Sequence, residues 1–126
     1  MPKLTSEQVK QLADNMLHMT NALGDYRYEN FDKLTEDENK KIKEIHGQML
    51  NYTTELYTKS ALLTMEDIES SLAQIDTISA KTRQLYKSLT GVQNVIDQAT
   101  GVLKIAAAIL SLDTTQISAS IKKMIG

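Results

Sequence analysis

The two histidines, His18 and His46, are the first candidates for metal chemistry in a chain that has no cysteine. Di-metal sites in helical bundles use Glu-x-x-His pairs on facing helices. His46 has no carboxylate three or four residues away on either side, and only Asp14 stands four residues before His18. Two groups do not complete a coordination sphere. We therefore expect a surface or capping interaction at His18, and neither a metal site nor another cofactor.

Nucleophilic catalysis would need a serine beside a histidine and an orienting acid. Serines and threonines are plentiful, so pairing any of them with a histidine has no specificity. The chain has no glycine-rich phosphate loop, because Gly91 and Gly101 flank part of an expected helix. Paired carboxylates fall only on faces expected to be solvated. We therefore expect no enzyme and no small-molecule substrate.

Helices are the elements that would position these residues. The 126 residues include one proline and five glycines, and the apolar residues hardly alternate, which favours an all-α fold. The hydrophobic share of 41% is ordinary for a globular protein, and the length fits a single domain, residues 1–126. The net charge of -2 predicts no nucleic-acid partner, because a phosphate backbone is bound by dense Lys and Arg.

Two heptad runs in the middle of the chain predict a long antiparallel helical hairpin, about residues 36–63 and 65–90. In each run, residues at alternating steps of three and four form a largely apolar stripe that another helix must cover, as in a coiled coil. The first stripe is Ile42, Ile45, Met49, Tyr52, Leu56 and Leu63. The second is Met65, Ile68, Leu72, Ile75, Ser79, Thr82, Tyr86 and Leu89. We therefore predict a four- to five-helix bundle built on this hairpin.

The two stripes do not share one register, because the step from Leu63 to Met65 is too short for a single helical face. We expect a turn near residues 60–64. Thr64 would cap the second arm, and Lys59 would lie near the end of the first, where a cation suits the helix dipole. The alternative is one continuous helix with a shifted stripe, since no glycine or proline marks the turn.

Ser79 and Thr82 occupy seam positions where apolar residues would pack better. One interpretation is a small polar site inside the bundle. The other, which we favour, is that small hydroxyl residues let a neighbouring helix approach or fix the pairing register.

Sequence patterns at the expected helix ends predict where several helices begin and stop. Capping patterns pair Thr5 with Gln8, Thr35 with Glu38, and Asp113 with Gln116. Gly24 is expected to end the first helix as a left-handed C-cap, and Thr90-Gly91 is expected to close the second arm of the hairpin.

Residues 25–34 are unusually rich in aromatic and cationic side chains for a chain that is only 5% aromatic. Tyr26, Arg27, Tyr28 and Phe31 would lie on a short helical turn or compact loop before the hairpin. One interpretation is a recognition surface, because Tyr and Arg are favoured binding anchors. The other, which we prefer, is a lid in which Phe31 and one tyrosine plug the end of the bundle.

The C-terminal part contains the longest apolar stretch. Residues 102–112 are nearly apolar all round except for Lys104, and the last helix, residues 114–125, has a narrow stripe. A helix that spans a bilayer needs about 20 apolar residues. We therefore expect a core helix, and the alternative is a membrane-active protein such as a toxin component that uses these C-terminal helices.

The predicted hairpin resembles the small helical hairpins of the WXG type, which are secreted partners of larger toxins. Tyr28 and Asp32 have the spacing of that family's Tyr-x-x-x-Asp export signal, but they precede the hairpin, and the chain has no Trp for the Trp-x-Gly turn. An acidic helical bundle is also similar in outline to the small immunity proteins that neutralise bacteriocins or toxins. Both resemblances imply a partner protein.

We expect a non-catalytic protein, of an immunity or secretion-partner type, that binds another protein or a second copy of itself by helix-face docking. The candidate partner-binding residues are Tyr26, Arg27, Tyr28, Phe31, Leu103, Ile109, Ile117 and Ile121. The N-terminal residues lack the charged-then-apolar pattern of a signal peptide. A cytoplasmic location is therefore the expectation, and export by a route that needs no signal stays open.

Overall fold

The computed structural model describes residues 2–88 and 91–125, and over these residues the predicted all-α fold is confirmed. The chain is 86% helical and has no strands in the described part. Its five α-helices are α1 (Ser6–Glu29), α2 (Glu36–Thr58), α3 (Ile68–Lys87), α4 (Val92–Ser111) and α5 (Thr114–Ile125). Two short 3-10 turns, η1 (Phe31–Lys33) and η2 (Ser60–Leu62), follow α1 and α2.

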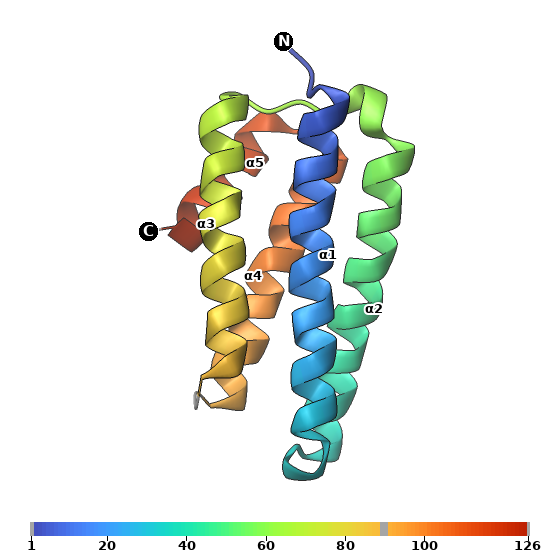
Figure 1. Ribbon diagram of the computed structural model, residues 1–126, viewed down its shortest axis with the longest axis vertical. Coiled ribbons are helices and arrows are strands. Elements are labelled where there is room, and N and C mark those ends of the chain that lie inside the picture. The colour runs from blue at the N-terminus through green and yellow to red at the C-terminus, as the bar shows by residue number, and fades with distance from the viewer. Residues whose placement is uncertain (1, 89–90, 126) are drawn as a thin grey trace.

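Helices α1 to α4 run side by side as a bundle, and α5 folds back along one side of it (Figure 1). Helix α1 packs against α2 and α3, and α4 packs against the same two helices. Helix α5 packs against α4 and α3. The predicted hairpin architecture is not confirmed, because α2 and α3 lie diagonally across the bundle and each packs along α1 and α4.

The stripes that predicted the hairpin are nevertheless largely buried, apart from Leu89, which lies outside the described residues. Ile45, Met49 and Leu72 are each at most 3% exposed, and Ile68 is half-buried. Each stripe therefore faces a core shared by all the helices. A heptad stripe shows that a helix is covered, but it does not show which helix covers it.

The chain between α2 and α3 explains why these two helices are diagonal. As Figure 1 shows, it crosses the end of the bundle as an extended connection. In extended chain, residues two apart point to the same side. Leu63 and Met65 are therefore both 0% exposed, which accounts for the step of two in the sequence. The Leu4 backbone N–H donates to the Leu63 carbonyl at 2.9 Å, so the N-terminal residues hold this crossing in place.

The helix starts agree with the capping patterns in three of four places. The boxes at Thr5 and Thr35 are complete, with reciprocal bonds to Gln8 and Glu38, and Asp113 accepts from two backbone N–H groups. The predicted cap at Thr64 is wrong, because the Asp67 carboxylate accepts from the Ser70 N–H at 3.1 Å instead. Lys59 ends α2 as predicted. The predicted Thr90-Gly91 stop falls partly outside the described residues, and Gly91 caps the start of α4.

Two helical glycines allow close approach between neighbouring helices. The prediction that Gly24 ends the first helix is wrong, since α1 continues to Glu29. A Cβ at Gly24 would lie 3.0 Å from His46 Nε2 on α2, so a glycine lets the imidazole lie over α1. A Cβ at Gly101 on α4 would collide with the Met124 sulfur on α5.

Candidate protein-binding site

The turn between α1 and α2 brings the aromatic stretch to the surface. The backbone N–H and the side-chain amide of Asn30 both donate to the Tyr26 carbonyl, at 3.0 Å and 2.9 Å, and end α1. The chain turns through η1, buries Leu34 and starts α2 at the Thr35 cap. The predicted short turn or loop over residues 25–34 is therefore only partly right, because residues up to Glu29 belong to α1.

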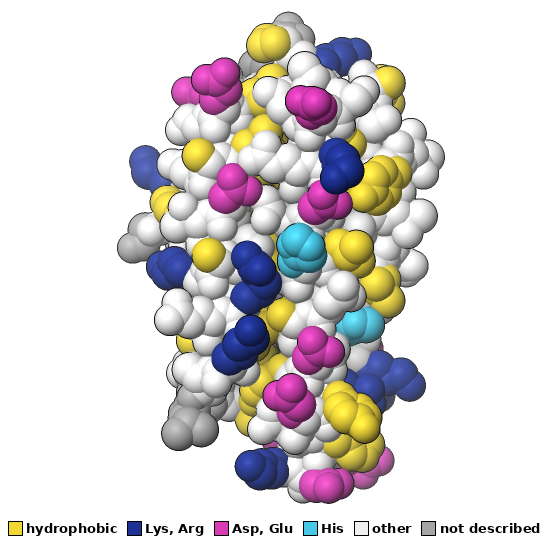
Figure 2. All heavy atoms as spheres, viewed as in Figure 1, with side chains coloured by type: hydrophobic (Ala, Val, Ile, Leu, Met, Phe, Trp, Pro, Cys, Tyr) yellow, Lys and Arg dark blue, Asp and Glu magenta, His cyan; other side chains and the backbone are white. Residues whose placement is uncertain are grey.

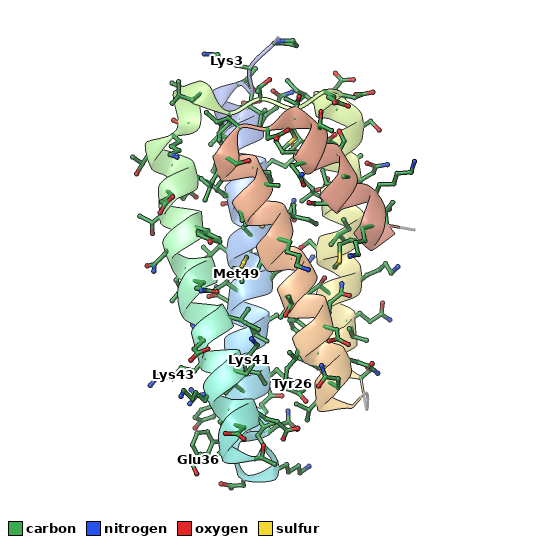
Figure 3. All side chains as sticks on the ribbon, turned by 180° about the vertical axis from the view of Figure 1, so that it is seen from behind. Lys3, Tyr26, Glu36, Lys41, Lys43 and Met49 are labelled. Carbon is green, nitrogen blue, oxygen red and sulfur yellow. The ribbon has the colours of Figure 1, made fainter. Side chains whose placement is uncertain are left out.

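Tyr26 belongs to the core and does not line a binding surface. It is 6% exposed, and its ring lies 6.2 Å from the ring of Tyr86 on α3. Figure 3 shows Tyr26 directed between the helices. Burial, and secondarily the charge of Glu38, raises the pKa of Tyr26, and burial raises the pKa of Tyr86. Both phenols therefore stay neutral, and the proposed role of Tyr26 as a partner anchor does not fit its position.

Tyr28 and Phe31 point the other way, into solvent. Tyr28 is 85% exposed and Phe31 is 51% exposed. The guanidinium carbon of Arg27 lies 5.4 Å from the centre of the Phe31 ring, a cation–π distance. The lid interpretation is therefore right for one tyrosine, Tyr26, and wrong for Phe31, which does not plug the bundle.

Next to these rings, α1, η1 and α2 enclose an open hollow of about 790 Å³, which we call the α1–α2 hollow. It is lined by Gly24, Arg27, Tyr28, Glu29, Phe31, Asp32, Lys43 and His46. The Arg27 Nε atom is buried and has no hydrogen-bond partner. In Figure 3, Lys43 is directed away from the bundle. The hollow thus combines exposed rings with cationic groups from two helices.

His46 forms part of the hollow and responds to its surroundings. Its imidazole lies over Gly24. Burial, and then the positive charge of Arg27, lowers the pKa of His46 below its ordinary value. The neutral imidazole is therefore the form that this site favours, and an anion in the hollow would offset the Arg27 part of this effect but not the part due to burial.

An apolar ridge extends the site along α2. Leu50 is 40% exposed and Tyr57 is 50% exposed. Lys43, His46, Leu50 and Tyr57 follow at steps of three, four and seven, which keep them on one side of the helix. Figure 2 shows an interrupted line of hydrophobic side chains along the α2 side of the molecule. We call the hollow and this ridge together the α1–α2 face.

Sequence reasoning missed the α2 half of this face. Lys43 lies among charged residues between Glu36 and Glu44 and carries no distinctive signal, while Leu50 and Tyr57 fall outside the core stripe. The step of seven from Leu50 to Tyr57, continued back to His46 and Lys43, was the signal for a second stripe on the same helix. Its outer position became visible only once the first stripe was known to face the core.

The other predicted anchors lie on α4 and α5 and are mostly inside the protein. Ile109 and Ile117 are 0% exposed, Ile121 is 1% exposed, and Leu103 is half-buried. The three isoleucines therefore do not form a surface for a partner, because they pack in this chain's own core. The alternative of a membrane-active protein used the same helices, so it would require them to leave the bundle.

A second, smaller hollow of about 250 Å³ lies between α1 and α3. Its lining mixes His18, Asp25 and Glu29 with Arg83 and Lys87. In Figure 2, Lys or Arg side chains lie beside a histidine on this side of the molecule. No exposed aromatic ring borders these charges, so this hollow is a weaker candidate for a protein-binding site than the α1–α2 hollow.

The polar seam residues do not form a binding site. Ser79 and Thr82 are both 0% exposed. Thr82 Oγ1 accepts a hydrogen bond from Gln98 Nε2 on α4 at 2.8 Å, whereas Ser79 Oγ has no partner. The Thr82 bond ties α3 to α4, which agrees with a role in fixing the packing of neighbouring helices.

Among the residues that the structure describes, no three His, Asp or Glu side chains gather as metal ligands. Asp14, which could have joined His18, forms an ion pair with Lys10 at 3.1 Å. None of the helices, as far as they are described, is both long enough and apolar enough to cross a bilayer. Comparison of the chain with protein-family models, curated proteins and solved structures gave no match.

Proposed function

We propose that this protein is a non-catalytic binding module and that its α1–α2 face docks a helix of another protein. The observation that carries the proposal is the exposure of Tyr28 and Phe31 beside Arg27. Large apolar side chains left in water next to one another favour a site that a partner covers. Tyr and Arg are also the residue types that most often dominate binding energy.

The shape of the face suits a helical partner. From Lys43 to Tyr57, the ridge covers fourteen residue steps of α2, or about 21 Å at a rise of 1.5 Å per residue. A partner helix of about four turns would lie along it, with its apolar side on Leu50 and Tyr57 and its end at the α1–α2 hollow. Immunity-type and secretion-partner proteins are two forms of this proposal, and they differ only in the protein that is bound.

The test is affinity capture from the producing cells with the tagged full-length chain, followed by quantitative mass spectrometry. We expect a partner that is retained by the wild type and reduced at least about tenfold by Tyr28→Ala or Phe31→Ala, as for a binding hot spot. The matched control is Leu112→Ala, which shortens an apolar side chain that is 36% exposed at the end of α4.

Equal capture by the wild type and both face variants would contradict the proposal. Light scattering on the purified chain separates the two kinds of partner. A dimer that Tyr28→Ala disrupts would make the occupant a second copy of this chain instead of another protein.

A further inference from the structure

We propose that the α1–α2 hollow receives a carboxylate from the partner, so that the docking segment of the partner is both acidic and apolar. This inference rests on the protein-binding function proposed above and names the chemistry of the partner at one end of the face. Its basis is the placement of Arg27, Lys43 and His46 around one open space.

Neither cationic side chain of the hollow, Arg27 or Lys43, forms an ion pair with a carboxylate of the described residues. Among the described residues, Lys10 and Asp14 form the one ion pair, so Arg27 and Lys43 are paired with no carboxylate. The Arg27 Nε atom is buried without an acceptor, which is unfavourable for a charged donor. A carboxylate is the group that a guanidinium binds best, through two parallel N–H···O bonds.

The position of the Arg27 guanidinium is restrained before any partner arrives. Its carbon lies 5.4 Å from the centre of the Phe31 ring. A cation held over a ring face loses less side-chain freedom on binding than a free arginine. The Phe31 ring also offers apolar surface beside the Arg27 charge. A carboxylate flanked by apolar side chains would therefore pair with the charge and cover the ring.

Two carboxylates, Glu29 and Asp32, also line the hollow, and both are exposed. They oppose an incoming anion, although their exposure means that water and salt screen this effect. A small free anion therefore gains little from the site. An acidic segment gains more, because its apolar neighbours also cover Tyr28 and Phe31, and this favours a protein over a simple ion.

His46 provides a way to detect the carboxylate. The charged groups around it are Arg27 and Glu29 from α1, Asp32 from η1 and Lys43 on its own helix. A bound carboxylate adds a negative charge and offsets the effect of Arg27, so the pKa of His46 is higher with an acidic peptide bound than with the same peptide carrying the amide, which covers the site equally. The preference for the acidic peptide over its amide therefore increases as the pH falls and His46 becomes protonated.

The experiment is a selection of random displayed peptides on the immobilised full-length protein. Selected peptides are first sorted by whether Tyr28→Ala and Phe31→Ala weaken them, which identifies binders of the α1–α2 face. The affinities of those binders are then measured with Arg27→Gln and Lys43→Gln. The matched control is Lys41→Gln, because Lys41 has the same charge on the same helix but does not line the hollow.

We expect the face binders to be enriched in Asp or Glu next to apolar residues. Arg27→Gln should weaken them at least about tenfold, and Lys43→Gln should weaken them less, whereas Lys41→Gln should leave them unchanged. Replacing the peptide's acid by its amide should remove the difference between the wild type and Arg27→Gln. Glu29→Gln should strengthen binding, and NMR titration of His46 should show a higher pKa with the acidic peptide bound than with its amide bound.

The outcomes separate this inference from the proposed function. Face binders that lack an acid, or that are insensitive to both Arg27→Gln and Lys43→Gln, would overturn the carboxylate proposal and leave the binding face intact. A selection that yields no binder sensitive to Tyr28→Ala or Phe31→Ala would overturn both. If circular dichroism shows that Arg27→Gln unfolds the chain, two measurements on folded protein still test the carboxylate proposal. These are the affinity of Lys43→Gln, which changes an exposed side chain, and the affinity of the wild type for the peptide in which the acid is replaced by its amide.

Discussion

The α1–α2 face and the contact between α4 and α5 are built alike but expose different chemistry. In each, a glycine lies under a side chain of the next helix: Gly24 under His46, and Gly101 under Met124. Around Met124, Ile117 and Ile121 of α5 are buried, whereas around His46 the rings of Tyr28 and Phe31 are open to water. The apolar region therefore stabilises the fold, and the aromatic, mixed-charge region is the one that we propose a partner covers.

This comparison shows that an apolar side chain is not necessarily accessible to a partner. Both regions were expected from the sequence to bind a partner. Ile109 and Ile117 are apolar and are covered within the chain, while Tyr28 lies in a polar stretch and is left uncovered. An apolar residue in a polar stretch is thus a better indication of an exposed apolar surface here than a continuous apolar helix.

The largest expected effect comes from shortening a buried residue of α5. Ile117→Ala should lower the free energy of unfolding by about 2–5 kcal/mol, because it removes a fully buried side chain and leaves a cavity. Leu50→Ala, at a position that is 40% exposed on α2, should change it by about 0.5 kcal/mol or less. Urea unfolding followed by circular dichroism measures both. Similar decreases in the free energy of unfolding for the two variants would contradict the distinction between a buried, stabilising region on α5 and an exposed face on α2.

A glycine pair on the α1–α2 side gives the next effect. Gly47→Ala should stabilise the protein by up to about 1 kcal/mol, since a Cβ there meets nothing and alanine favours the helix. Gly24→Ala should stabilise the protein less, because the added Cβ would lie too close to the His46 imidazole. As the imidazole moves outward, the pKa of His46 should rise toward about 6.5. Thermal unfolding and NMR titration would show this, and equal results for the two variants would argue against the close approach.

The pH dependence of stability tests the surroundings of His46. Because burial and Arg27 lower its pKa in the folded state, the unfolded chain binds the proton more readily. The contribution of His46 to stability is therefore complete above the unfolded pKa of about 6.5 and is lost as the pH falls from there through the lower pKa of the folded state. His46→Gln should reduce the loss of stability between about pH 7 and pH 5 relative to the wild type. Identical curves would show that the imidazole is not perturbed.

The smallest effect on stability is expected at the centre of the proposed site. Tyr28→Ala should change the free energy of unfolding by no more than about 0.5 kcal/mol, because the ring is 85% exposed. The same change should nearly abolish partner capture. A large loss of stability would mean that Tyr28 is structural, which would contradict its assignment to the binding face.

The sequence predicted the helices themselves better than it predicted which helices pack against each other. Capping boxes at Thr5 and Thr35 depend on residues three apart, and the stripe with Ile45 and Met49 depends on one helix, so local patterns sufficed. The pairing of helices depended on the path of residues 59–67. That path is held by the Leu4 bond to Leu63, a contact across the chain that no local pattern encodes.

The candidate site was predictable only in part for the same reason. Arg27, Tyr28 and Phe31 were found because they are close in sequence and unusual in type. Lys43 and His46 reach the same hollow from α2 across the turn, so their place followed from the tertiary fold. The C-terminal isoleucines were misjudged as surface anchors because a sequence does not show which helices cover an apolar face.

Site-specific photo-cross-linking in the producing cells tests most directly whether the α1–α2 face is the docking surface. A benzophenone amino acid would replace Tyr28 in one variant and, as the control, Leu112 at the far end of α4 in the other. The account predicts a discrete cross-linked complex from position 28 and none from position 112. A complex formed only from position 112, or none from position 28 under conditions where the partner is captured, would contradict it.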